Sequence, residues 1–181
     1  NTGGDHGDLT DDYAAIRKEM EAVAAHFGKH VLREVELETV ESHVGELRRA
    51  CGDRAVLRAL HYYDENARVL EQAAAIRGGD LPAFFDAVKR SGDSSWKLLQ
   101  NVYARSTEEQ MAMGIELSRR FLHGDGAQRV HGGGFAGTIQ AYVPLDRLDD
   151  YKKLMEDAFG PGSCTALMVR PEGAVMMPME G

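Results

Sequence analysis

The chain has 181 residues, of which 43% are apolar, and it carries a formal net charge of −8. This length and apolar content suffice for the core of one domain. The acidic charge disfavours nucleic acid and anionic membranes as partners, because both require a basic footprint on the protein. No run approaches the roughly 18 apolar residues of a membrane span, so we expect a soluble domain.

The cysteines and the first residues bear on compartment and on domain organisation. Cys51 and Cys164 lie far apart in the sequence and in no paired metal spacing. They are typical of small buried hydrophobic residues in a reducing compartment, so we expect a cytoplasmic protein. The chain opens on Asn1-Thr2-Gly3-Gly4 without an initiating methionine, which indicates a fragment of a longer chain.

Helical spacing of apolar residues dominates the first half of the chain. Apolar residues recur every three or four positions from Leu9 to Phe27, which predicts a helix that Asp8 or Thr10 caps and that ends at Gly28. Three further helices are expected, over residues 40–50, from Asp53 to Gly78, and after an N-cap at Asp80.

The second half of the chain begins with apolar residues at helical spacing and then changes to the alternating spacing of strands. Residues 96–103 predict a short helix, and Thr107 with Gln110 forms a capping box that predicts a helix to Leu122. Alternating apolar residues then predict two strands on either side of residues 132–137 and a last strand over residues 164–169. A further helix is expected over residues 148–158, and residues 172–181, with three methionines, are expected to form a tail.

This order of elements predicts an α+β fold. Many helices precede a strand, a second strand, a helix and a third strand, which favours a small, mostly antiparallel sheet of ferredoxin-like pairing with helices covering one face. We expect one domain.

The most informative stretch is the loop between the first two expected strands. It reads Gly132, Gly133, Gly134, Phe135, Ala136 and Gly137. Small residues there allow close approach to the backbone, either by another segment of the protein or by a phosphate on exposed N–H groups. The two best-known phosphate loops do not fit, because no Lys-Ser or Lys-Thr follows and a strand, not a helix, comes next.

Polar clusters elsewhere in the chain are weaker candidates for a binding or catalytic site. His6 and its neighbours Asp5, Asp8, Asp11 and Asp12 could hold a cation, but an acidic helix start explains them better. His61 and Glu65, one turn apart, are either an acid–base pair or a helical hydrogen bond, and the helical bond is favoured.

A group of serines also allows two interpretations. Ser91, Ser94 and Ser95 lie beside Gly92. They could bind an anion or cap the next helix, and capping is favoured.

Four segments together resemble a known family. The run RVHGGGFAGTIQAYVP over residues 129–144 resembles the third motif of the galactokinases, members of the GHMP small-molecule kinase superfamily. Residues 61–69 are similar to that family's His-x-x-x-Glu-x-x-Arg-Val helix, and the Gly79-Asp80-Leu81 turn follows in the expected place. Residues 5–13 resemble the segment in which galactokinases carry a sugar-contacting tyrosine, here Tyr13.

The resemblance covers nearly the whole chain but only the family's carboxy-terminal domain. It implies that residues 1–181 form a GHMP-type carboxy-terminal domain, that Tyr13 contacts the sugar and that residues 132–137 form a wall of the active cleft near the phosphate. The loop that holds the ATP phosphates and the catalytic aspartate and arginine belong to the family's amino-terminal lobe. We therefore expect no catalytic residue and no metal ligand in this chain.

The leading hypothesis is a galactokinase that, at full length, converts galactose and ATP with Mg²⁺ to galactose 1-phosphate, while this chain alone is inactive. Its expected partners are the sugar and the amino-terminal lobe. Residues 91–95 and 105–110 depart from the family pattern, which leaves the sugar less certain than the kinase. The alternatives are a catalytically silent, sugar-sensing regulator and a GHMP kinase for another small alcohol.

Overall fold

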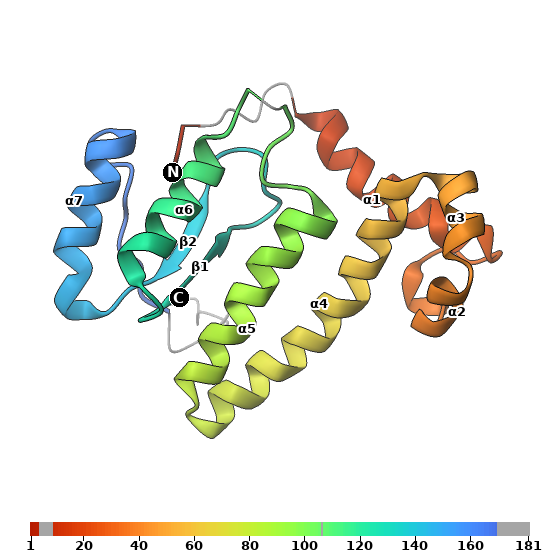
Figure 1. Cartoon of the computed structure of the whole chain (residues 1–181), viewed down its shortest axis with the longest axis horizontal. Helices are drawn as coiled ribbons and strands as arrows, with labels where there is room; N and C mark the ends of the chain where they lie inside the picture. The colour runs from red at the N-terminus through yellow and green to blue at the C-terminus, as the bar shows by residue number, and fades with distance from the viewer. Residues whose placement is uncertain (4–8, 106, 170–181) are drawn as a thin grey trace, which may run out of the picture.

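The computed structural model describes residues 1–3, 9–105 and 107–169, and their main elements are labelled in Figure 1. The helices are α1 Thr10–His26, α2 Leu37–Ser42, α3 Val44–Cys51, α4 Asp53–Gly78, α5 Leu81–Ser94, α6 Gln110–Leu122 and α7 Leu148–Phe159, and the strands are β1 Ala127–Val130 and β2 Ile139–Tyr142. Short 3-10 helices span Leu32–Glu34 and Leu145–Arg147, and a π-helix spans Ser95–Leu99.

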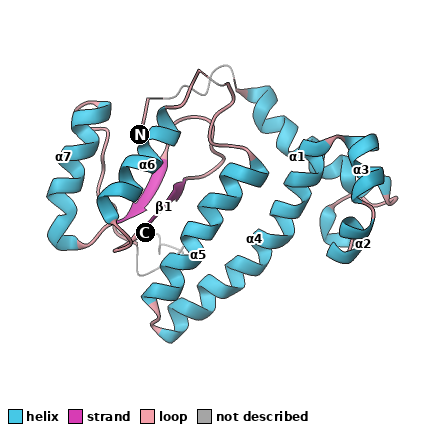
Figure 2. Cartoon of the chain, viewed as in Figure 1, coloured by secondary structure: helices cyan, strands magenta, loops and turns pink. Residues whose placement is uncertain are grey.

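The long helices α4 and α5 form the middle of the molecule. They pack against each other, α1 and α3 pack on α4, and the two strands pack on α5 and α6. Figures 1 and 2 show the small helices α2 and α3 at one end and α6, α7 and the strands at the other. The α4–α5 pair therefore connects a wholly helical end to the end that carries the sheet.

The helical end has its own apolar core. Residues from α1, α3 and α4, whose apolar side chains recur at helical spacing, meet there with residues of α2 and of the segment 32–35. The buried members are Val23, Ala24, Leu32, Val35, Val40, Leu47, Ala55, Val56 and Ala59. This core holds the start of α4 against α1.

The strands form an antiparallel hairpin that is covered on both faces. Val130 pairs with Ile139, and both pack on α6 through Met111. Tyr142, on the opposite face, contacts Phe84 and Phe85 of α5. The predicted antiparallel pairing is confirmed, but the expectation that helices cover only one face is wrong, since α5 and α6 enclose the hairpin.

The third predicted strand is wrong. Residues 164–169 adopt no strand, and β2 pairs only with β1 among the described residues. Leu167, Met168 and Val169 are each about nine-tenths exposed, so neither face of this alternating segment is buried by described residues. Alternation predicts a strand only where one face is covered. The described part of the predicted ferredoxin-like sheet is therefore the β1–β2 hairpin alone.

The glycines predicted to end helices do so, whereas only one of the predicted side-chain caps at the helix starts is formed among the described residues. Gly28 and Gly79 both have positive φ just after α1 and α4, and the Asp80 carboxylate accepts the Ala83 N–H as predicted. The capping box at Thr107 does not form, because α6 begins at Gln110 with no side-chain cap.

Three other boundaries differ from the predictions. At the start of α1 the N-cap is Leu9, which makes no side-chain cap bond, while Asp8 lies outside the described residues. His43 divides the helix expected over residues 40–50 into α2 and α3. Of the helix expected over residues 96–103, only residues 96–99 are helical, as part of the π-helix Ser95–Leu99.

The described residues bear on two further expectations. Their helices are all too short or too polar to cross a membrane. Cys51 and Cys164 are free thiols and partly buried, not fully buried as predicted, and burial raises the pKa of each. The expected tail at residues 172–181 lies outside the described residues.

Candidate functional site

The glycine loop, residues 132–137, connects β1 to β2 and has an exposed first half and a buried second half. Gly132 and Gly133 are exposed, whereas residues 134–137 are buried. Gly132, Gly134 and Gly137 have φ values of +65°, +81° and +89°, and Phe135 has a φ of +55°. Positive φ favours glycine, so the loop conformation accounts for three of its four glycines.

Close approach explains the remaining glycine and reinforces Gly134. A Cβ atom at Gly133 would lie 2.8 Å from the Tyr13 ring. A Cβ atom at Gly134 would lie 2.6 Å from Nδ2 of Asn101 and nearer still to the Asn101 carbonyl oxygen. Of the two explanations that the sequence allowed, another segment of the protein therefore fits Gly133 and Gly134. Gly132 has no described atom within 4 Å of such a Cβ and faces open space.

Tyr13 lies in the first turn of α1 and holds the loop from one side. Its hydroxyl donates a 2.6 Å hydrogen bond to the Gly134 carbonyl. Its ring contacts Phe135 edge-to-face, with centroids 5.3 Å apart, and Leu9 and Ala136 complete this cluster. The structure thus brings together Tyr13 and the loop, which the sequence identified separately.

Asn101 holds the loop from the other side, and the sequence analysis missed it. Its carbonyl accepts the Phe135 N–H at 2.7 Å, and its Nδ2 donates to the Gly133 carbonyl at 3.1 Å. The one local signal was an asparagine just after a short helix, which predicts only a turn. Among described residues, no atom accepts from the amides of Gly132 and Gly133, and both glycines are exposed.

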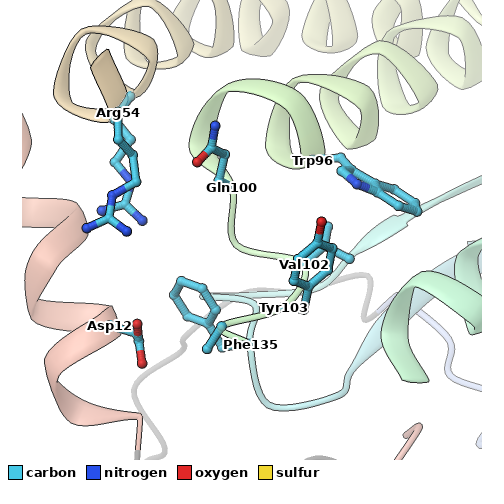
Figure 3. Close-up of a pocket in the computed structure, with 9 residues that line it drawn as sticks. Asp12, Arg54, Trp96, Gln100, Val102, Tyr103 and Phe135 are labelled. Atoms are coloured by element: carbon cyan, nitrogen blue, oxygen red, sulfur yellow. The ribbon is translucent and has the colours of Figure 1, made fainter. Parts of the chain in front are cut away.

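A hollow of about 340 Å³ lies beside the loop. Figure 3 shows Arg54 and Asp12 on one side, with Tyr103 and Phe135 opposite. The complete lining is Asp12, Arg54, Arg58, Trp96, Gln100, Val102, Tyr103, Ala104 and Phe135. Its size is within the usual range for small-molecule sites.

The charges of this hollow are largely balanced internally. Arg54 and Arg58 both bind the carboxylate of Glu19, at 2.6 and 2.8 Å. Burial lowers the pKa of Arg58, against the opposing effect of Glu19. The two cations and the carboxylates of Glu19 and Asp12 leave little net charge, so a neutral polar ligand fits this wall better than a polyanion.

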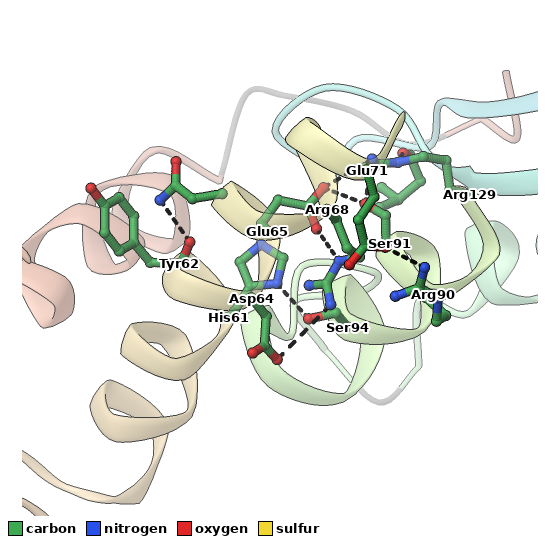
Figure 4. A network of polar contacts seen from close by, with 12 residues as sticks. His61, Tyr62, Asp64, Glu65, Arg68, Glu71, Arg90, Ser91, Ser94 and Arg129 are labelled. Carbon is green, nitrogen blue, oxygen red and sulfur yellow. Dashed lines mark hydrogen bonds and ion pairs between the residues drawn. The ribbon is translucent and has the colours of Figure 1, made fainter. Parts of the chain in front are cut away.

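A buried polar network joins α4, α5 and β1, as Figure 4 shows. The Glu65 carboxylate accepts bonds from Arg68 Nε at 2.9 Å, from Arg129 Nη1 at 3.3 Å and from the Ser91 hydroxyl. Arg129 Nη1 also donates to Ser91 at 2.5 Å. Burial pushes the pKa of Glu65 up, but the bonds from Ser91 and Arg68 and the nearby cations outweigh burial and lower it.

This network answers two questions left open by the sequence. His61 Nδ1 bonds to the Ser94 hydroxyl at 2.9 Å, while Glu65 bonds to other residues, so neither interpretation of the His61–Glu65 pair holds. Burial lowers the pKa of His61, which favours the neutral ring. Ser91, Ser94 and Ser95 are all buried. Helix α5 continues through Ser94, and Ser94 makes no cap bond to the π-helix, so the favoured capping interpretation is wrong.

The suggested cation site at the start of the chain is only partly described. Asp5, His6 and Asp8 lie outside the described residues. Within the described ranges, no three histidine, cysteine or acidic side chains converge as a metal site would require.

Comparison with known proteins supports the resemblance seen in the motifs. No protein-family model matches the chain. The galactokinase of Mannheimia succiniciproducens is 30% identical over 154 residues, which are 85% of this chain and 38% of that protein. The galactokinase of Haemophilus influenzae strain KW20 is 31% identical over 159 residues, 88% of this chain and 40% of that protein.

A solved structure gives the same picture of the fold. The galactokinase of Lactococcus lactis, in a crystal structure with galactose, aligns with a TM-score of 0.68 at 18% identity over 88% of this chain and 40% of that one. The predicted similarity to galactokinases and the predicted fold of their carboxy-terminal region are confirmed. The chain spans about two fifths of the length of the galactokinases that it matches.

Proposed function

We propose that this chain is the carboxy-terminal lobe of a galactokinase, whose complete protein transfers the γ-phosphoryl group of ATP to galactose. The observation that carries the proposal is the similarity to galactokinases over 85–88% of the chain, joined to the packing of the predicted sugar tyrosine on the glycine loop. This lobe supplies one wall of the cleft, and the amino-terminal lobe supplies the other.

The contribution of this lobe to the reaction is positional. Phosphoryl transfer depends on alignment and on stabilisation of charge more than on covalent chemistry of the protein. Tyr13 would bind a sugar hydroxyl, and the exposed Gly132–Gly133 backbone would allow sugar and phosphate to approach. Bound Mg²⁺ would neutralise phosphate charge. We propose that its ligands lie on the amino-terminal lobe, as the resemblance implies.

The departures from the family pattern at residues 91–95 have a structural explanation that leaves galactose as the leading substrate. Ser91 and Ser94 are buried and bond to Glu65 and His61 of α4. Their hydroxyls therefore stabilise the α4–α5 contact and do not face a ligand.

A conservative change at Tyr13 tests the proposed role in sugar binding. In the complete protein, Tyr13→Phe should raise the KM for galactose about fivefold, because one hydrogen bond to the sugar is lost, and should also lower kcat, because the bond from the hydroxyl to the Gly134 carbonyl is lost with it. A coupled ADP-release assay measures both constants. Tyr103→Phe is the matched control, since Tyr103 lines the neighbouring hollow and should leave both constants unchanged.

Other outcomes of the same assay favour the alternatives. An increase in KM with Tyr103→Phe instead of Tyr13→Phe would move the sugar to the hollow. Turnover of another sugar or small alcohol in place of galactose would favour a different GHMP kinase. Galactose binding without ADP release, together with an amino-terminal lobe that lacks the catalytic aspartate and arginine, would favour the sugar-sensing regulator.

A further inference from the structure

We propose that Asn101 is a positioning residue of this cleft, which sets the glycine loop in the conformation that the reaction needs. The inference rests on the proposed function, because it assigns Asn101 a role in that reaction. Asn101 itself is buried, with 1% of its surface exposed, so it acts through the loop and not by contact with substrate.

Asn101 forms hydrogen bonds with two successive peptide groups of the loop. Its carbonyl accepts the Phe135 N–H at 2.7 Å, and its side-chain Nδ2 donates to the Gly133 carbonyl at 3.1 Å. These bonds flank Gly134, whose α-carbon faces Asn101 with no room for a side chain. They also support Phe135 at a φ of +55°, a conformation that a bulky residue adopts only where its surroundings impose it.

The backbone conformation before Asn101 positions this residue for its two bonds to the loop. Residues 95–99 form a π-helix, closed by the Gln100 N–H donating to the Ser95 carbonyl at 2.8 Å. Gln100 then turns the chain with a φ of +58°. A π-helix followed by a non-glycine residue in the left-handed region is rare and is found preferentially at functional sites.

One side chain, Arg58 of α4, binds both α1, which carries Tyr13, and Leu99, which lies two residues before Asn101. Arg58, 2% exposed, donates from Nε to the Leu99 carbonyl at 3.0 Å and from Nη1 to Glu19 of α1 at 2.8 Å. Tyr13, six residues before Glu19 on α1, bonds to Gly134. Contacts therefore run from α1 through Arg58 to Leu99, along the backbone to Asn101, and from Asn101 to the loop. Tyr13 connects the loop back to α1. Together these contacts fix the loop relative to Tyr13, the predicted sugar contact.

The side chain of Asn101 has an unfavourable effect on the stability of the fold, and a role in packing alone does not explain why it is present. Its Oδ1 is buried and has no hydrogen-bond partner among the described residues. An unpaired buried acceptor is unfavourable, and an apolar residue of similar shape would avoid that cost. The Gly133 carbonyl is on the exposed part of the loop, where water can replace the lost donor. The amide therefore serves the position of the loop more than the stability of the fold.

The test compares Asn101→Leu, which keeps the approximate shape, with the unmodified complete protein. Hydrogen exchange at the hydrogen-bonded amides of Phe135 and Ala136 should become about tenfold faster, because the loop is held by one bond fewer. The kcat for galactose should fall about 10- to 100-fold, since small misplacements in a phosphoryl-transfer site are costly, while KM changes less than twofold. Asn101→Ala should behave alike if the leucine variant folds poorly.

A matched variant and a separate readout make the result decisive. Asn66→Leu replaces an exposed asparagine whose side chain bonds only within α4, and it should change neither loop exchange nor kcat. Unchanged loop exchange in both Asn101 variants overturns the proposal, as does a loss of kcat that merely follows a loss of folded protein. Failure of the unmodified protein to phosphorylate any sugar contradicts the proposed function instead, and loop exchange then still decides whether Asn101 positions the loop.

Discussion

Gly134 is the residue of the loop where conformation and space together exclude a side chain. Its φ is +81°, and a Cβ atom there would overlap the Asn101 amide and carbonyl. Gly132 has a similar φ of +65° but no described atom within 4 Å of such a Cβ. A substitution at Gly132 therefore introduces backbone strain alone, whereas one at Gly134 introduces strain and steric overlap.

Alanine at each of these glycines gives a paired prediction. Gly132→Ala should lower the free energy of unfolding by about 1 kcal/mol, the cost of a left-handed non-glycine residue. Gly134→Ala should lower it by about 3 kcal/mol, because strain and overlap add. Urea unfolding of the chain measures both. Equal losses at the two positions would show that the Asn101 contact is looser than described.

Single residues also set the limit of what could be predicted about the site. The loop was identified from composition alone, because a run of six residues of which five are glycine or alanine is unusual between two strands. Tyr13 was identified as a ligand contact only through the family resemblance, since its spacing on the apolar stripe of α1 also fits a core residue. Asn101 had a local signal only for a turn and none for its contact with the loop, because its loop partners lie more than 30 residues away.

At the scale of elements, prediction worked where the determinants are local in sequence. The periodic stripes of α1 and α4 and the glycines after them depend on residues within a few turns, so these helices were placed correctly. The serines at residues 91–95 resemble a helix break, but they bond to α4, more than 25 residues earlier. The segment at residues 164–169 alternates like a strand, but a strand forms only where a partner is available.

The close packing of α5 on β1 yields a prediction at this scale. Gly92 of α5 faces β1, and a Cβ atom there would lie 3.0 Å from the Arg129 Cβ and 3.2 Å from the Gln128 carbonyl oxygen. Gly92→Ala should therefore lower the free energy of unfolding by about 1 kcal/mol, because the overlap outweighs the gain in helix propensity.

Gly45 is the matched control for this change. It is also helical, but its nearest neighbour would be a flexible arginine tip at 3.8 Å. Gly45→Ala should raise the free energy of unfolding by about 0.5 to 1 kcal/mol through helix propensity alone. Urea unfolding of both variants checks the pair, and a stabilising Gly92→Ala would contradict the close α5–β1 contact.

At the scale of the whole molecule, the candidate site is one-sided. We propose that Tyr13 and the exposed Gly132–Gly133 backbone contact the sugar, and among the described residues no three histidine, cysteine or acidic side chains converge as a metal site would require. The chain covers about two fifths of the galactokinases that it matches. We propose that the rest of the complete protein supplies the catalytic wall, as the resemblance implies.

The most direct test of this account is a comparison of ADP release from ATP and galactose by the complete protein and by residues 1–181 alone. The complete protein should turn over galactose, and the isolated chain should release no ADP above background, because half of a cleft neither aligns the two substrates nor stabilises the transferred phosphoryl group. Robust turnover by residues 1–181, or no sugar phosphorylation by the complete protein, would contradict the account.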